Sequence, residues 1–304
     1  MPYVSIIGAA ILDIIAKSNA TLIVNDSNPG TISQSAGGVG RNIAENLARL
    51  DVDVKLIAAI GTDPAGKYLL DECTQMGIDM QYCQVKEGGV SSTYIAMLDN
   101  YGEMAMAIVD YATPLSLEHV SKNFSVINNS EIIVMESNLS EHEISAILDM
   151  FPAQDIFVDA ISVTKAQRLK NVLSRFHTIK MNRLEAECLA DMAINCDGSL
   201  EKAGAYFLAQ GIKRIVISLG AEGIFYKTKT EQLWHKPAPI VPINATGAGD
   251  ALMAGLIYCT LHKKDANYTL QFSQAMAQAA LQSERAVNPK ISQRSIKNGI
   301  FKHE

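Results

Sequence analysis

Short hydrophobic runs alternate along the chain with stretches in which apolar residues recur every three or four positions. The runs are typical of strands buried on both faces, and the recurring pattern is typical of helices with one buried side. The predicted strands are Val4–Gly8, Val54–Ile60, Ile132–Met135, Ile156–Asp159, Thr178–Met181 and Ile215–Leu219. The predicted helices are Arg41–Leu50, Ala65–Met76, Glu141–Met150, Thr164–Arg175, Arg183–Met192, Leu200–Gln210 and Asp250–Leu261. This alternation predicts an α/β fold with a mostly parallel central sheet and helices on both faces.

Two segments depart from the alternation. Ser91–Tyr111 has the pattern of a strand, a turn at Asn100–Glu103 and a second strand, and Ile14–Thr31 contains short extended pieces with a turn at Asn28–Gly30. Neither segment fits a strand–helix–strand unit. We therefore predict a small second sheet, a lid formed by inserts at about residues 11–35 and 88–112 of a single domain, with an ordinary edge hairpin as the alternative.

The composition narrows the class of protein. Of 304 residues 48% are hydrophobic, which is enough for a large core, and no uncharged apolar run is long enough to cross a membrane. The formal charge of −6 argues against binding to nucleic acid or to an anionic membrane. The five cysteines include no CxxC pair, so neither a disulfide framework nor a zinc site is expected. We expect the protein to reside in a reducing cytoplasm.

The stretch NATGAGDALMAG, residues 244–255, combines glycines with an aspartate at the start of a predicted helix. Gly247 and Gly249 allow the backbone to approach a ligand closely, and a helix N-terminus offers free N–H groups to a phosphoryl group. Asp250 lies in the first helical turn, where a carboxylate can take the proton from an attacking hydroxyl. The alternative is that Asp250 only caps the helix.

A second glycine loop occurs in SAGGVGRNIAENLARL, ahead of another predicted helix. Gly37, Gly38 and Gly40 free the backbone there, and the side-chain amide of Asn42 can bond a sugar hydroxyl as donor and acceptor. The loop is not a dinucleotide-binding fingerprint, because GxGxxG is not met and no predicted strand leads directly into it.

Two further stretches have competing interpretations. In KMNRLEAE, Asn182 and Glu185 lie three residues apart at a helix start, where they can hold Mg²⁺ with water, form a capping box, or do both. The stretch Gly61–Tyr68 matches the core of a phosphate-binding GxxxxGK loop. It ends in tyrosine instead of serine or threonine and contains Asp63 and Pro64, so we reject its interpretation as a phosphate-binding loop.

The motifs GGVGRN, NRLE and TGAGDA, in this order, resemble the signatures of the ribokinase or PfkB family of carbohydrate and nucleoside kinases. The resemblance covers essentially the whole chain. It implies a ribokinase-like fold, a small sheet that closes over the substrate, ATP and Mg²⁺ as phosphoryl donor and metal, and a homodimer formed through the lid. NDSNPGTIS, LDNYGEM and KMNRLEAE are most similar to members that phosphorylate pseudouridine.

The implied reaction is phosphorylation of the 5′-hydroxyl of a ribosyl compound, with pseudouridine as the leading acceptor. The alternatives are ribose or another nucleoside or sugar, and a noncatalytic sugar-binding protein on the same fold. The resemblance assigns the general base to Asp250 and the anion hole to Gly247, Ala248 and Gly249. It assigns sugar contacts to Asp13, Gly38, Asn42 and Glu136, nucleotide contacts to Asn182, Ser218, Gly220 and Thr246, and a water-mediated metal contact to Glu185.

Three positions depart from the family pattern. Ile11 stands where an asparagine is common, and Val39 stands where ribokinase-like sequences have lysine, so the pocket is more apolar and suits a substrate that carries a base. Asn244 replaces an aspartate that helps to form a monovalent-cation site in some members, which argues against K⁺ activation. Thr93, Tyr94, Tyr111 and Asn138 lie in the segments where contact with a base is expected, and the alternative for each of them is packing within the lid.

Overall fold

The computed structural model describes residues 2–244 and 246–301. Its main sheet has the strand order β14-β13-β12-β11-β10-β9-β1-β4. The strands from β12 to β4 pair with their neighbours in parallel. β13 pairs antiparallel with β12, and β14 pairs antiparallel with β13. The predicted mostly parallel sheet is therefore confirmed. The bounds are β1 (Tyr3–Ile7), β4 (Asp53–Ile57), β9 (Ile132–Glu136), β10 (Ile156–Asp159), β11 (Thr178–Asn182), β12 (Arg214–Ser218), β13 (Ile224–Lys227) and β14 (Gln232–His235).

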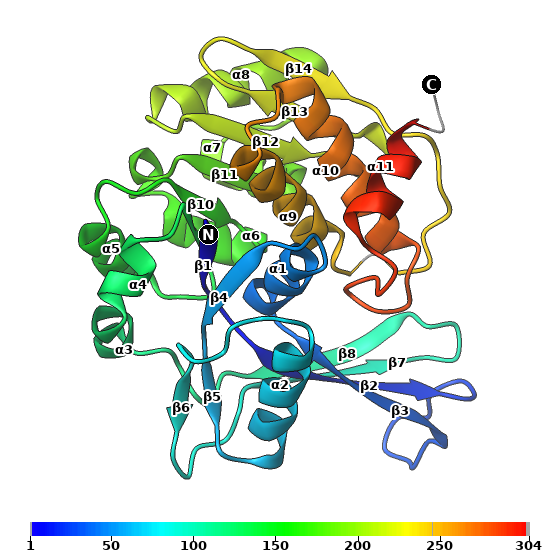
Figure 1. Ribbon diagram of the computed structural model, residues 1–304. Coiled ribbons are helices and arrows are strands. Elements are labelled where there is room, and N and C mark those ends of the chain that lie inside the picture. The colour runs from blue at the N-terminus through cyan, green and yellow to red at the C-terminus, as the bar shows by residue number, and fades with distance from the viewer. Residues whose placement is uncertain (1, 245, 302–304) are drawn as a thin grey trace.

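Helices cover both faces of this sheet (Figure 1). Successive strand residues point to opposite faces, so Ile6 of β1 packs in the core beneath α1, α9 and α10, whereas Ile7 packs in the core beneath α5, α7 and α8. No helix among the described residues is long and apolar enough to span a membrane. The helices are α1 (Val39–Ala48), α2 (Pro64–Gln75), α3 (Leu117–Lys122), α4 (Phe124–Asn128), α5 (Glu141–Met150), α6 (Val163–Ala166), α7 (Arg183–Ala190), α8 (Asp197–Ala209), α9 (Ala248–Leu261), α10 (Ala266–Leu281) and α11 (Gln293–Phe301).

A second, four-stranded sheet stands beside the main one, and we call it the lid sheet (Figure 1). Its order is β3-β2-β7-β8, with strands β2 (Ile11–Ser18), β3 (Gly30–Gly37), β7 (Thr93–Leu98) and β8 (Met104–Asp110). Both irregular segments of the sequence thus form one small sheet, as predicted, and the edge-hairpin alternative is wrong. The expectation that no strand leads into the first glycine loop is also wrong, because β3 ends at Gly37 and α1 begins at Val39.

Two predicted elements differ from the structure. The expected strand Val54–Ile60 is divided, because after β4 the chain leaves the main sheet and β5 (Ala59–Gly61) pairs with β6 (Gln84–Lys86). The expected helix Thr164–Arg175 is instead α6 followed by two short 3₁₀ turns, Gln167–Leu169 and Leu173–Arg175. Tighter turns still bury the apolar side chains of this segment, so its hydrophobic spacing resembles that of a continuous helix.

Candidate active site

The N-terminus of α9 provides the candidate anion hole. Gly247 is the N-cap residue with φ 84°, and a Cβ at this position would lie 1.9 Å from the carbonyl oxygen of Ala286. Only glycine therefore fits. Among the described residues no side chain caps the helix, so its first N–H groups remain available to a ligand. Asp250 is the third residue of α9, so the alternative in which it caps the helix is wrong.

Asp250 and Asn42 meet although 208 positions separate them in the sequence. The Nδ2 atom of Asn42, in the first turn of α1, donates to Oδ2 of Asp250 at 2.8 Å. Burial raises the pKa of Asp250 to about 7, and the negative charge of Asp159 adds to this, while the bond from Asn42 opposes it. A carboxylate with a pKa near 7 is matched to accepting a proton at neutral pH.

A buried ion pair fixes the amide of Asn42. Arg41 donates to Oδ1 of Asn42 and also pairs with Glu45, which in turn pairs with Arg49. Because Arg41 occupies the amide oxygen, the NH₂ group faces Asp250. That group has two N–H donors, so one remains for an oxygen of a substrate.

Sequence analysis missed a second ion pair, which lies under the anion hole. Nζ of Lys180 lies 3.0 Å from Oδ2 of Asp159, and both side chains are buried. A Cβ at Gly249 would lie 2.5 Å from the same Nζ, so the ammonium packs directly against the glycine loop. Asp159 also accepts from the N–H of Ile161, whose φ of 62° is strained for a β-branched residue.

The charges around Lys180 keep it protonated. Burial alone would lower the pKa of Lys180, but the charges of Asp159, Glu185 and Asp250 outweigh burial and raise it. A signal for this pair exists in the sequence, because Asp159 is a charged residue that ends one apolar strand and Lys180 is a charged residue within the next one. A buried charge requires a partner, and β10 and β11 are neighbours in the sheet.

The expected nucleotide side lies at the ends of β11 and β12. Asn182 and Glu185 form a capping box: Asn182 Oδ1 accepts from the Glu185 N–H at 2.9 Å, and Glu185 Oε2 accepts from the Asn182 N–H at 2.7 Å. Asn182 is paired in register with Ser218, whose hydroxyl donates to the Met181 carbonyl at 3.4 Å. Gly220, with φ 61°, follows at the start of a 3₁₀ turn.

The turn before α9 is held by the side chain of Asn244. Its Oδ1 accepts from the N–H of Thr246 at 2.9 Å, and its Nδ2 donates to the carbonyl of Glu284 at 3.1 Å. Thr246 is exposed and directly precedes the anion-hole glycine. Within residues 2–244 and 246–301, no cluster of three or more His, Cys, Asp or Glu side chains could hold a metal ion.

Glu136 joins the backbone after β1 to the start of α1, at the expected sugar side of the site. Its Oε1 accepts from the N–H of Ala9 at 2.8 Å and from Nδ2 of Asn138 at 2.7 Å, and its Oε2 accepts from the N–H of Gly40 at 2.7 Å. Gly38 has φ 98°, and a Cβ there would lie 2.4 Å from the Ala9 carbonyl oxygen. Burial raises the pKa of Glu136 to about 7. Glu136 thus holds the loop geometry, and one lone pair of Oε2 remains for a substrate.

Asp13 lies where the lid sheet meets the first glycine loop. It is in β2, opposite Ser35 of β3, and a Cβ at Gly37 would lie 2.0 Å from its Oδ2. Burial raises the pKa of Asp13 to about 6, against the lowering effect of Arg41. The fold therefore places Asp13 of β2 against Gly37, next to Gly38 and the start of α1, which carries Asn42.

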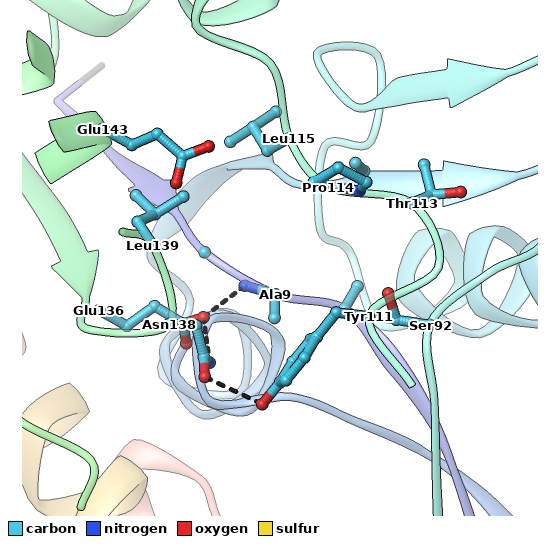
Figure 2. A pocket seen from close by; sticks show the side chains of 13 residues that line it. Ala9, Ser92, Tyr111, Thr113, Pro114, Leu115, Glu136, Asn138, Leu139 and Glu143 are labelled. Atoms are coloured by element: carbon cyan, nitrogen blue, oxygen red, sulfur yellow. Dashed lines mark hydrogen bonds between the residues drawn. The ribbon is translucent and has the colours of Figure 1, made fainter. Parts of the chain in front are cut away.

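A cavity of about 100 Å³ opens beside Glu136 (Figure 2). Tyr111 and Asn138, two of the residues predicted to contact a base, line it, whereas Asn42 and Asp250 do not. The other two predicted residues are engaged elsewhere: the hydroxyl of Tyr94 donates to the sulfur of Met104 within the lid sheet, and that of Thr93 donates to the Ser91 carbonyl.

Comparison with known proteins identifies the family of this chain. The model of the pfkB family carbohydrate kinases matches residues 1–293. The chain belongs to the PfkB family. It is 38% identical over 293 residues to the pseudouridine kinase of Escherichia coli (strain K12), covering 95% of this chain and 94% of that protein.

Solved structures show the same PfkB architecture over the whole chain. A Clostridium perfringens structure described as a sugar kinase has a TM-score of 0.91 and 34% identity, covering 99% of this chain and 96% of that one. An Arabidopsis thaliana ribokinase complexed with ribose and ATP has the same fold, with a TM-score of 0.85 at 18% identity and 99% coverage of both chains. As a PfkB member the chain is a phosphotransferase that acts on an alcohol group of a sugar or nucleoside.

Proposed function

We propose that this PfkB kinase transfers the γ-phosphoryl group of ATP to the 5′-hydroxyl of a ribosyl compound, with pseudouridine as the acceptor. The observation that carries the proposal is the buried Asp250 at the open N-terminus of α9, paired with Asn42 of the sugar-side loop. The 38% identity to a pseudouridine kinase supports the choice of acceptor. The five free cysteines support a reducing cytoplasm as the place of the reaction.

In this mechanism Asp250 accepts the proton of the 5′-hydroxyl while the hydroxyl oxygen bonds to the γ-phosphorus. The bond between that phosphorus and the bridging oxygen breaks, and ADP leaves with the bridging oxygen. The raised pKa of Asp250 suits proton acceptance, and the bond from Asn42 holds the carboxylate in place. The N–H groups at the start of α9 and the ammonium of Lys180 stabilise the charge on the transferring group.

Mg²⁺ fits the nucleotide side of the site. The carboxylates of Asp159, Glu185 and Asp250 outnumber the ammonium of Lys180, so the region favours an added cation. Asn182 and Glu185 already bond each other, which leaves lone pairs for waters of a hydrated Mg²⁺ rather than a complete set of ligands. Bound Mg²⁺ would neutralise phosphate charge.

Activity without a monovalent cation is supported by the turn before α9. Asn244 uses both its amide oxygen and its amide nitrogen within that turn, with Thr246 and Glu284 as partners. The position that is aspartate in some family members is therefore neutral here and already bonded. We infer that K⁺ does not activate this kinase.

We also propose that the lid sheet closes over the acceptor and joins two copies of the chain. Every residue of the edge strand β8 is exposed, and Met106 and Ile108, two positions apart in a regular part of the strand, share one face. An exposed edge with an apolar face is an unpaired surface that a second strand can cover. Closure would exclude water, which competes with the acceptor for the phosphoryl group.

The test of the acceptor is ADP release with Mg-ATP across pseudouridine, uridine, cytidine, adenosine, ribose, fructose and fructose 6-phosphate. We expect the highest kcat/KM with pseudouridine. A higher value with ribose or with another nucleoside would contradict the acceptor and leave the phosphoryl-transfer chemistry intact. Binding of these compounds without any ADP release would contradict the kinase proposal itself.

A further inference from the structure

A polar cluster of Tyr111, Asn138 and Lys165 adjoins the cavity at Glu136: Tyr111 and Asn138 line the cavity, and Lys165 reaches its edge by bonding both of them. Lys165 Nζ donates to Oδ1 of Asn138 and, at 2.9 Å, to the hydroxyl oxygen of Tyr111. The Tyr111 hydroxyl donates to the same Oδ1 at 3.3 Å, and Nζ lies 5.5 Å from the centroid of the Tyr111 ring. Figure 2 shows Glu136, Asn138 and Tyr111 in a continuous line along the cavity. Tyr111 follows β8 of the lid sheet, and Lys165 comes from α6 of the main body.

This cluster lies at the end of the site opposite to the proposed general base. One line of contacts runs from Asp250 to Asn42 at the start of α1, and the neighbouring Gly40 bonds Glu136, which bonds Asn138. A nucleoside with its 5′-hydroxyl at Asp250 must direct its base away from Asp250. The cavity, lined by Glu136 and Asn138 but not by Asp250, lies at the far end of these contacts.

The hydrogen-bond capacity of the cluster defines the chemistry that it can recognise. Lys165 has three N–H donors and uses two, and the amide of Asn138 has two and uses one on Glu136. Two donors therefore remain, on neighbouring atoms. Carbonyl oxygens satisfy such donors, whereas an exocyclic amino group presents further N–H donors.

We propose that the cavity is the nucleobase pocket and that Lys165 and Asn138 donate to carbonyl oxygens of an oxo-pyrimidine such as uracil. This inference rests on the proposed kinase function and adds the residues that select the base. Tyr111 couples the pocket to the lid sheet, because its hydroxyl contacts both Lys165 and Asn138 of the main body.

The charge environment of Lys165 supports a recognition role. Its side chain is half-buried, and no carboxylate among the described residues lies within ion-pair distance of its ammonium. By contrast Lys170, five residues later, pairs with Asp191 at the surface. A partly desolvated cation held by neutral oxygens gains from one more acceptor, and a base carbonyl supplies it without introducing a charge.

The test replaces Lys165 by methionine, which keeps most of the side-chain length and removes the donors. We expect Lys165→Met to lower kcat/KM for pseudouridine about tenfold or more, mainly through KM, because a lost bond to a charged donor is worth that much. The preference for pseudouridine over cytidine should shrink, while turnover of ribose, which has no base, should not change. Tyr111→Phe should give a smaller loss in the same direction.

Lys170→Met is the matched control and should behave like the wild type in every assay. A loss in Lys165→Met that is equal for pseudouridine and ribose, or no change in the ratio of pseudouridine to cytidine, would overturn the pocket assignment. Melting temperatures near the wild-type value show that the variants are folded. If the wild-type protein phosphorylates no nucleoside, the function proposal fails before any variant is made, so the two failures are distinguishable.

Discussion

The main sheet and the lid sheet differ in which side chains they bury and which they expose. In the main sheet, charged groups such as Asp159 and Lys180 are buried and bonded to one another. In the lid sheet, apolar side chains such as Met106 and Ile108 are more than half exposed. The main sheet therefore carries desolvated charge, and the lid sheet carries uncovered apolar surface.

This difference separates the two tasks of a kinase. Buried, mutually bonded charges are already oriented before a substrate arrives, so phosphoryl transfer requires little rearrangement of the main body. An exposed sheet gains stability only when a substrate or a second chain covers it, which suits closure and assembly. Variants in one region should therefore affect chemistry, and variants in the other should affect assembly.

The largest expected effect comes from Asp250, in the main body. Asp250→Asn keeps the shape of the side chain and removes its ability to take a proton. We expect kcat to fall by about 10²–10⁴ while ATP still binds, because this is the usual contribution of a positioned base. ADP release measures kcat, and calorimetry measures ATP affinity.

An exposed aspartate provides the control for this substitution. Asp197→Asn, at the start of α8, changes the same functional group at the surface and should leave kcat unchanged. A kcat for Asp250→Asn within tenfold of the wild-type value would show that Asp250 is not the general base.

Substitutions in the lid sheet should change assembly instead of catalysis. A double substitution of Met106 and Ile108 by lysine places charge on the apolar face of β8, and we expect a wild-type dimer to become monomeric. Light scattering after gel filtration measures the mass. Val85→Lys, a similarly exposed apolar residue of β6, should remain dimeric. A monomeric wild-type protein at working concentration would contradict the proposed assembly.

Local patterns predict the parallel part of the main sheet because strands such as β1, β9, β10 and β11 are buried, mostly apolar runs, whereas the edge strand β14 is half exposed and has no such pattern. The prediction fails where two structures share one pattern. In the segment Thr164–Arg175, Leu169 and Leu173 are buried by 3₁₀ turns as well as a helix would bury them, so spacing cannot distinguish the two. Likewise, the run Val54–Ile60 gives no sign that its last residues pair with β6 instead of the main sheet.

The site is less predictable because its decisive contacts join distant segments. The motifs locate Asn42 and Asp250, but no spacing shows that their side chains bond each other. Glu136 is predicted as a sugar contact, and the structure shows in addition that it holds two backbone N–H groups. Lys165 lies in α6, the part of the predicted helix Thr164–Arg175 that is helical, and its proximity to Asn138 depends on how α6 packs after β10.

The smallest expected effect is on stability, and it involves one buried acid from each region, Asp250 of the main body and Asp13 of the lid sheet. Burial raises the pKa of Asp250 from 3.8 to about 7 and that of Asp13, in the lid sheet, from 3.8 to about 6. At pH values between the ordinary and the raised pKa of each acid, the folded state holds a proton that the unfolded state has lost. The free energy of unfolding therefore falls as pH rises through this range. At pH 8, but not at pH 4, replacing either acid by asparagine should stabilise the ligand-free protein.

Asp250→Asn should give the larger gain, because its pKa is displaced further than that of Asp13. We expect at least about 1 kcal/mol, which corresponds to roughly 2 °C in melting temperature for a chain of this size. Asp13→Asn should give a smaller gain, since Asp13 keeps more contact with water. Melting curves at pH 4 and pH 8 measure both. Equal gains at the two pH values would mean that asparagine improves packing, and that neither carboxylate is destabilised by its burial in the ligand-free protein.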